Sequence, residues 1–356
     1  MHENATPEWC DKCTLAPCEC PSLFANVRAW RSGETRKVKP TIMRRTDDAH
    51  VFYRGRLNVL IGDPESAKTW VALAAVAKEL QRGGRALYVD TDHNGIDGIV
   101  PRLDILGAPA DAVDDMNRFR YAEVDSADEY AQVLASAKEW RPTITVLDAH
   151  ASIADMHGLN DNDGGEMRRF HRTLTYPFTE GGGAVILIDH MAKNETSRAF
   201  GGTGSTAKNA AVNGVMYRVD VLDAWSEPTG GSVKLYVVKD RPAGVRSRCA
   251  PVKGREKPFF GTFRLHPPRD GEVEQAWAIY PPNRDGETPE MNDLVARIEH
   301  LPDSDRTSVR RVREVLGGRN SDVAEALKIW RMQQGLAPTD DEDRVTAPPA
   351  PPLIPA

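Results

Sequence analysis

The segment LIGDPESAKTW, residues 60–70, decides the fold of this chain. The apolar run LNVLI (57–61) predicts a buried strand before the loop, and TWVALAAVAKEL (69–80) predicts a helix after it. A loop of the pattern G-x-x-x-x-G-K-[ST] in this context binds phosphate through backbone N–H groups and the helix N-terminus. Ala67 stands where the pattern has glycine. Because Ala67 directly precedes the helical Lys68, we expect it to have a helical φ and to be tolerated at little cost.

The predicted phosphate-binding segment comprises Gly62, Asp63, Pro64, Glu65, Ser66, Ala67, Lys68, Thr69 and Trp70. Lys68 would place its ammonium group on the β- and γ-phosphates of a nucleotide, and the Thr69 hydroxyl would bind Mg²⁺. The alternative is an ordinary strand-to-helix turn that happens to contain a lysine. The polar residues at the ends of the neighbouring strands favour the nucleotide site.

Three more apolar segments predict strands with polar residues at their ends: RALYVD (85–90) with Asp90 and Asp92, TITVLD (143–148) with Asp148, and AVILID (184–189) with His190. Asp148 would hold the Mg²⁺ shell through water, and Asp90 or Asp92 would orient or deprotonate the attacking water. His190 could sense the γ-phosphate. Each aspartate alone could equally cap a strand or turn, and His190 could be a core histidine. Together they fall where open α/β sheets bind ligands.

The alternation of Val/Ile/Leu-rich segments with helical ones predicts an α/β fold, with a mostly parallel central sheet covered on both faces. GVMYRVDVL (214–222) and SVKLYVVKD (232–240) have little helix between them, so we expect antiparallel strands there. The net charge of −6 argues against a protein coated in positive charge but permits a local basic strip. Because there is no apolar run of about 18 residues and no secretion signal, we expect a cytoplasmic protein that makes no membrane contact.

Six segments in this order carry a resemblance to a known family: GDPESAKT (62–69), LYVDTDHNGIDGIVPRLDILGA (87–108), TVLDAH (145–150), ILIDHMAK (186–193), GGTGSTAKNAA (201–211) and VVKDRPAG (237–244). They resemble RecA-like P-loop ATPases of the broad AAA class, specifically the branch of the DnaB-type and RepA-type hexameric replicative helicases. The resemblance covers roughly residues 51 to 250. It is specific for the superfamily and weaker for the choice of helicase over recombinase or clock-type ATPase.

The resemblance implies a homo-hexamer that hydrolyses ATP with Mg²⁺. The family uses a glutamate after the second strand as catalytic base, and Asp92 stands at the matching place with a side chain shorter by one methylene. In such rings a Lys-x-Arg pair on a late strand reaches the neighbouring subunit's nucleotide, and Lys239 and Arg241 match this pair. A guanidinium supplied in trans stabilises charge on the γ-phosphate. The alternative for the pair is a solvated strand end.

Single-stranded DNA is the partner that the resemblance implies. Residues 191–210, with Lys193, Arg198 and Lys208, correspond to the mobile loop that faces the central channel of such rings. Scattered cations and backbone amides suit a sugar–phosphate track without base reading. A plain surface loop is the alternative.

Four cysteines lie within eleven residues near the N-terminus: Cys10, Cys13, Cys18 and Cys20. Their spacing, C-x2-C-x4-C-x-C, fits a structural zinc site held by thiolates. The last spacing is tight and a second knuckle is missing. A Cys-rich leader without a metal therefore stays open as the alternative.

The chain accordingly divides into a Cys-rich segment (1–30), a basic linker (31–50), a RecA-like ATPase domain (51–285), a helix-turn-helix or winged-helix-like unit (286–336) and an acidic, Pro-rich tail (337–356). The function expected is an ATP-dependent, ring-forming DNA helicase of phage or plasmid replication, with a separate primase or loader protein. Two alternatives are a RecA- or RadA-like recombination ATPase that forms filaments on DNA, and a weakly hydrolysing, ATP-switched loader or regulatory module. The missing glycine and the shorter Asp92 favour slow hydrolysis.

Overall fold

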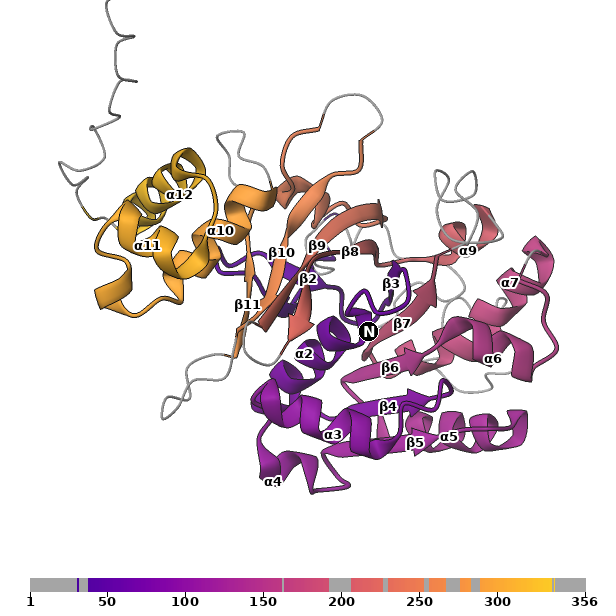
Figure 1. Ribbon diagram of the computed structural model, residues 1–356. Coiled ribbons are helices and arrows are strands. Elements are labelled where there is room, and N and C mark those ends of the chain that lie inside the picture. The colour runs from indigo at the N-terminus through magenta and orange to yellow at the C-terminus, as the bar shows by residue number, and fades with distance from the viewer. Residues whose placement is uncertain are drawn as a thin grey trace, which may run out of the picture. The chain divides into compact units, whose positions relative to one another are not determined.

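The computed structural model describes residue 31 and residues 38–161, 163–191, 206–226, 230–252, 256–266, 276–282, 289–334 and 336. The chain divides between residues 38 and 39 into two units. The elements described below lie in the second unit (Figure 1). Their arrangement explains why polar residues from distant parts of the sequence meet at one edge of a sheet.

Nine strands of the described residues form one sheet, in the order β11-β10-β9-β8-β3-β7-β6-β4-β5. Their bounds are β3 Leu57–Gly62, β4 Ala86–Asp90, β5 Phe119–Glu123, β6 Ile144–Asp148, β7 Ala184–His190, β8 Val215–Ser226, β9 Gly230–Asp240, β10 Phe259–Leu265 and β11 Trp277–Tyr280. The pairs from β5 through to β8 are parallel, whereas β8–β9, β9–β10 and β10–β11 are antiparallel. The predicted α/β fold with a mostly parallel sheet is confirmed, as is the antiparallel end.

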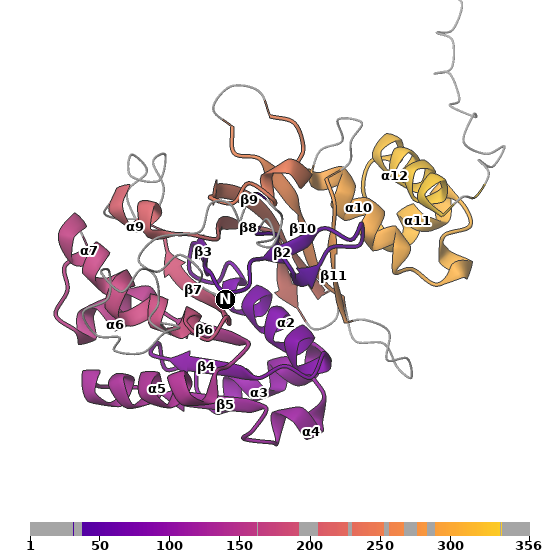
Figure 2. The same ribbon diagram turned by 180° about the vertical axis from the view of Figure 1, so that it is seen from behind.

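Helices cover both faces of the sheet, because the side chains of a strand alternate between the two faces. Leu60 packs in a cluster with the helices α2 (Lys68–Gln81), α3 (Ile96–Ile105) and α4 (Ala110–Val113). Its neighbours Val59 and Ile61 pack in a second cluster with α5 (Ala127–Trp140), α6 (His150–Met156), α7 (Gly164–Phe170), η2 (His171–Thr175) and η3 (Tyr176–Thr179). Figure 1 shows α2, α3 and α4 together in indigo to violet and α5, α6 and α7 in magenta, and Figure 2 shows them from behind.

The register of the parallel strands brings their carboxyl ends together. Gly62 at the end of β3 pairs with His190 at the end of β7. Asp90 at the end of β4 pairs with Asp148 at the end of β6. The loop after β3 therefore opens at the same edge as the predicted acidic residues and the histidine.

Residues 42–52, which fall mostly in the segment expected to be a linker, form a hairpin of β1 (Ile42–Arg44) and β2 (His50–Phe52). Ile42, Met43 and Phe52 are buried in the same cluster as α2. The basic residues alone suggested a solvated linker. The apolar side chains of the hairpin instead help to cover one face of the sheet.

Three helices follow the sheet, as the sequence predicts: α10 (Pro289–Glu299), α11 (Val309–Leu316) and α12 (Asn320–Gln333). They share a small apolar core that includes Ile298, Val312 and Leu327. The described residues after Tyr280 contain no strand, so a wing is not seen among them. The other short elements are α9 (Thr206–Ala211), η4 (Arg246–Arg248) and η5 (Asp303–Asp305). The helices found in the described residues are too short or too polar to cross a membrane.

Candidate nucleotide site

The loop between β3 and α2 has the backbone of a phosphate cradle, and Ala67 takes the left-handed conformation that glycine adopts most readily. Its φ is +60° and its ψ is 24°, at the N-cap position of α2. Our expectation of a helical φ at Ala67 is therefore wrong. The chain must turn sharply from the loop into the helix, and the left-handed region is the one that makes this turn. Glu65 also has a positive φ, of 59°.

Gly62 begins the loop at a point where a side chain has no room. A Cβ atom on Gly62 would lie 2.5 Å from the Ser66 Oγ and 2.6 Å from the Val219 carbonyl oxygen. The Val219 carbonyl belongs to the neighbouring strand β8, which cannot retreat without breaking the sheet. Glycine at this position therefore follows from packing, and it lets the loop fold back over the end of β3.

The Lys68 ammonium lies inside the loop. Nζ donates to the carbonyl oxygens of Gly62 at 3.1 Å and Asp63 at 2.7 Å, and to the Ser66 Oγ at 3.3 Å. The residue is 4% exposed. Burial lowers the pKa of Lys68, while the Asp148 carboxylate and other nearby aspartates raise it. A cation held in a concave loop of backbone groups is suited to bind phosphate oxygens.

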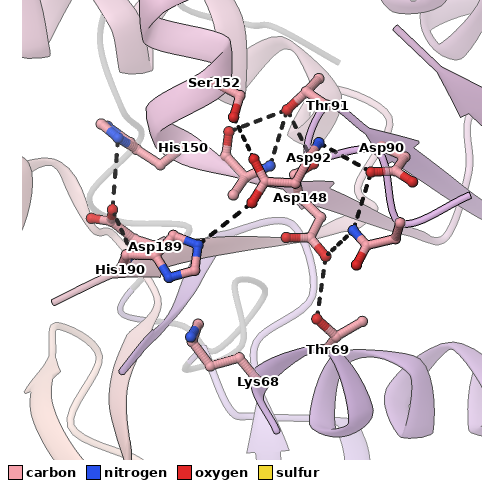
Figure 3. Close-up of polar contacts among 12 residues, drawn as sticks. Lys68, Thr69, Asp90, Thr91, Asp92, Asp148, His150, Ser152, Asp189 and His190 are labelled. Atoms are coloured by element: carbon pink, nitrogen blue, oxygen red, sulfur yellow. Dashed lines mark hydrogen bonds and ion pairs between the residues drawn. The ribbon is translucent and has the colours of Figure 1, made fainter. Parts of the chain in front are cut away.

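Asp148 faces the first turn of α2 across the site (Figure 3). Its Oδ2 accepts from the Thr69 hydroxyl at 3.3 Å, from the Tyr88 hydroxyl at 2.5 Å and from Asn94 Nδ2 at 3.4 Å. Burial, together with the charges of Asp92 and Asp90, raises the pKa of Asp148 to about 6, although the bond from Tyr88 opposes this. A buried carboxylate next to a hydroxyl is a site that favours a cation.

Mg²⁺ fits this donor set. The ion is usually held by one or two carboxylates and by substrate phosphates, and it keeps several waters. Thr69 and Asp148 would supply the protein part of that shell. The described residues contain no group of three or more His, Cys, Asp or Glu side chains that could hold a metal by themselves. The site therefore suits a metal that arrives with a nucleotide.

Asp90 is fully buried and its carboxylate is occupied by the turn that follows β4. Oδ1 accepts from Asp92 N and Asn94 Nδ2, both at 3.1 Å, and Oδ2 accepts from Gly95 N at 3.0 Å and the Tyr121 hydroxyl at 2.8 Å. With these four bonds the side chain holds the turn in place. The geometry favours Asp92 over Asp90 for a role in the reaction.

Asp92 projects from this turn into the cavity beside the loop. One carboxylate oxygen accepts from the Ser152 hydroxyl, and the other lies 3.5 Å from His190 Nε2 (Figure 3). The hydrogen bond with His190 keeps the pKa of Asp92 below its usual range, and that with Ser152 adds to this against the effect of burial. Nδ1 of His190 is buried and has no hydrogen-bond partner among the described residues. Asp92 and His190 thus form a polar pair at the cavity.

The cavity has a volume of about 360 Å³ and contains residues that the sequence did not single out. Asn94 and Arg102 follow β4, and Trp225 lies on β8. Asn94 is separated from Asp92 by one residue, so its polar side chain in the same turn was a usable signal. Trp225 is distant in sequence from the loop, and only the β3–β8 pairing brings it there.

Lys239 and Arg241 lie beside the amino end of β3, whereas the loop follows its carboxyl end. Arg241 N donates to Gly214 O at 3.1 Å, and Gly214 N donates to the carbonyl of Leu57, the first residue of β3, at 3.0 Å. Lys239 Nζ donates to the carbonyls of Asn209 and Ala210, and Arg241 Nη2 donates to Ala210 O at 3.3 Å. Neither residue lines the cavity.

Lys208 was predicted to contact DNA, but its side chain is buried. The residue is 5% exposed, and Nζ lies 2.8 Å from Asp161, 3.6 Å from Asp189 and 3.3 Å from His150 Nδ1. Burial and the Lys208 charge lower the pKa of His150 to about 3. The predicted DNA contact of Lys208 does not fit this placement, because the two carboxylates hold its ammonium in the interior.

Several other predicted residues lie outside the described residues. They are the proposed DNA contacts Lys193 and Arg198, and the cysteines of the predicted zinc site, Cys10, Cys13, Cys18 and Cys20.

The fold and the loop are those of a RecA-like P-loop domain, and the comparisons with known proteins point to the same class of protein. The family described as "AAA domain" matches residues 28–196. The chain is 26% identical over 215 residues to the RecA protein of Leptospira biflexa, and 23% identical over 211 residues to that of Mesomycoplasma hyopneumoniae. These matches cover 56% and 54% of this chain, and 51% and 58% of the relatives. The chain thus spans little more than half the length of these RecA proteins.

Among solved structures, the chain is similar to a KaiC-like protein of Pyrococcus horikoshii OT3, with a TM-score of 0.45 and 12% identity. The match covers 69% of this chain and 98% of that protein.

Proposed function

We propose that this protein is an ATP-dependent, ring-forming translocase or helicase that moves on single-stranded DNA. The observation that carries the proposal is the separation of the Lys239–Arg241 pair from the chain's own loop. Arg241 adjoins the start of β3 and the loop follows its end. At about 3.3 Å per residue, the strand places them roughly 16 Å apart, which is beyond the reach of an arginine. A basic pair that cannot act in cis is available to a neighbouring subunit.

Within one subunit, five polar residues of the cavity have a defined task. Lys68 holds the β- and γ-phosphates, and its present carbonyl partners are replaced by phosphate oxygens. Thr69 and Asp148 would hold Mg²⁺, which would neutralise charge on the phosphates. Asp92 accepts a hydrogen bond from the attacking water, and Ser152 and His190 fix its orientation. The low pKa of Asp92 keeps it ionised at neutral pH and makes it a weak base, so we expect slow hydrolysis.

DNA would lie along the segment that follows β7. Lys193 and Arg198 remain the proposed contacts to the sugar–phosphate track, and Lys208 is no longer one of them. The segment starts directly after His190, and Lys208 is tied to Asp189. This short connection is a route by which DNA could influence the phosphate end of the cavity.

The second candidate function is a RecA-like ATPase that forms filaments on DNA. The similarity to two RecA proteins favours it. A filament would also place the basic pair of one subunit on the nucleotide of the next, so the pair does not separate the two functions. The two functions differ in whether the subunits close into a ring or continue as an open filament.

The test is the ATPase rate with and without single-stranded DNA, together with electron microscopy of the particles and a fork-unwinding assay. The Lys68→Ala variant is the control that removes nucleotide binding. Stimulation by DNA, closed rings and unwinding would support the translocase. Open filaments without unwinding would support the RecA-like function. An unstimulated rate with monomeric particles would overturn both and leave an ATP-switched regulatory module.

A further inference from the structure

Part of the cavity wall is aromatic. Trp70 on α2 and Trp225 on β8 lie with ring centroids 5.3 Å apart and planes inclined by 41°. The Arg102 guanidinium, from α3, stands over the Trp70 ring at 5.5 Å. All three residues are half-buried and line the same cavity as Lys68 and Asp92. Three elements therefore converge to keep an indole pair next to a phosphate loop.

The spacing of the two indoles decides how a flat molecule could bind. Non-bonded carbon atoms approach to about 3.5–4.0 Å, so a ring held between two others needs about 7 Å between them. Trp70 and Trp225 are too close for that, and Arg102 lies over Trp70. The surface available for stacking is therefore that of Trp225. Trp70 and Arg102 support it from behind.

A carboxylate stands beside this surface. Asp223, two residues before Trp225 on β8, also lines the cavity, and its side chain is 41% exposed. Its Oδ2 accepts from the Ser232 hydroxyl at 3.0 Å and from Arg264 Nη1 at 3.2 Å. These bonds fix the carboxylate in a direction from which it can accept a hydrogen bond from an amino group in the cavity.

We propose that Trp225, supported by Trp70 and Arg102, stacks on the base of a purine nucleoside triphosphate whose phosphates lie on the loop 62–69. The proposal rests on the nucleotide site inferred above. Because the loop residues and Trp225 line one cavity, one triphosphate can contact both. A two-ring base covers more of the Trp225 face than a one-ring base. Adenine and guanine also carry an amino group that can donate to Asp223, whereas uracil carries none.

The experiment measures binding by calorimetry, with Mg–ATP, Mg–UTP and Mg–tripolyphosphate as probes. Stacking of a base on an aromatic side chain is worth enough to expect about tenfold or greater loss of ATP affinity in Trp225→Ala. Tripolyphosphate has no base, so its affinity should stay at the wild-type value. Trp225→Phe keeps an aromatic face and should recover most of the ATP affinity. Trp140→Ala, which removes a tryptophan that does not line the cavity, should bind ATP as the wild type does.

The outcomes separate this proposal from the proposed function. Equal affinities of the Trp225→Ala and wild-type proteins for ATP would overturn base stacking and leave the phosphate site intact. Equal affinities of the wild-type protein for ATP, UTP and tripolyphosphate would likewise overturn base stacking and leave the phosphate site intact. Absence of binding of any of the three probes to the wild-type protein would instead overturn the nucleotide site itself. If Trp225→Ala lost tripolyphosphate binding to the same extent as ATP, the residue would be structural and the proposal would fail.

Discussion

Ala67 holds a backbone conformation that a side chain makes costly. Its Cβ atom approaches the following carbonyl oxygen when φ is near +60°, at a cost of roughly 1–2 kcal/mol. The left-handed residue starts α2 and thereby directs the loop N–H groups toward the phosphate position. The loop thus keeps its shape at the expense of stability.

Ala67→Gly should stabilise the protein by roughly 0.5–1 kcal/mol, because relief of the left-handed strain exceeds the entropy that glycine gains in the unfolded chain. Chemical denaturation measures the change. Ala72→Gly, in the buried interior of α2, is the control for the intrinsic cost of glycine and should destabilise the protein. A loss of stability in Ala67→Gly would show that the side chain's packing outweighs the strain.

Asp148 is a second residue that lowers the stability of the fold while its carboxylate suits Mg²⁺ binding. Its pKa is raised to about 6 from 3.8, so the folded protein takes up a proton that the unfolded chain does not hold. Stability of the ligand-free protein therefore falls as pH rises through this window, and the charged carboxylate costs on the order of 2–3 kcal/mol at pH 7. A proton on Asp148 also competes with Mg²⁺.

Asp148→Asn should raise the stability of the ligand-free protein at pH 7 by about 1–3 kcal/mol, and should flatten its pH dependence between pH 4 and 6. Its amide oxygen can still accept from Tyr88. Affinity for Mg–ATP should fall about tenfold or more, since the metal loses its carboxylate. Denaturation curves from pH 4 to 8 and calorimetry test both parts. Identical pH profiles for the two proteins would refute the role of this carboxyl.

At the scale of elements, the sequence predicted what depends on neighbouring residues. The apolar segments and the G-x-x-x-x-x-K-T spacing locate β3, its loop and α2, because strand period and loop chemistry are local. The burial of Lys208 was not predictable in this way. Its partners Asp161 and Asp189 lie on separate segments, and only tertiary packing decides that a lysine in a polar stretch turns inward.

Lys208→Ala should destabilise the protein by about 3–5 kcal/mol, because it leaves Asp161 and Asp189 without their buried cation. A thermal melt measures the loss. Lys193→Ala, at a proposed DNA contact, should leave the melting temperature unchanged and weaken binding to single-stranded DNA. If Lys208→Ala instead leaves the melting temperature unchanged and weakens binding to single-stranded DNA, the lysine leaves its buried position and contacts DNA.

At the scale of the whole molecule, one subunit holds only part of the proposed machinery. Lys68, Asp92 and Asp148 meet at one edge of the sheet, and Arg241 lies near the other. The sequence could suggest this division by resemblance. No pattern within one chain specifies how a second copy is placed, because that depends on surfaces that meet only in the assembly.

Mixing two inactive variants tests whether Arg241 of one subunit acts at the phosphate loop of the next. Lys68→Ala should not bind nucleotide, and Arg241→Ala should bind it but not hydrolyse it. In a random equal mixture about a quarter of the interfaces pair an intact loop with an intact arginine, so a matching share of activity should return. The mixture is compared with each variant alone in an ATPase assay. Failure to regain activity in co-assembled particles would remove the trans arrangement.

The ion pair near the end of β10 connects the C-terminal helices to the wall of the cavity. Arg264 contacts Asp223 in the cavity wall and Asp293 on α10, and its side chain is 6% exposed. A protein shortened to its ATPase core would keep every residue of the phosphate loop, yet it would lose Asp293 and leave the buried Arg264 guanidinium with Asp223 as its remaining carboxylate partner. The C-terminal helices therefore help to hold the wall of the cavity through the contact of Asp293 with Arg264.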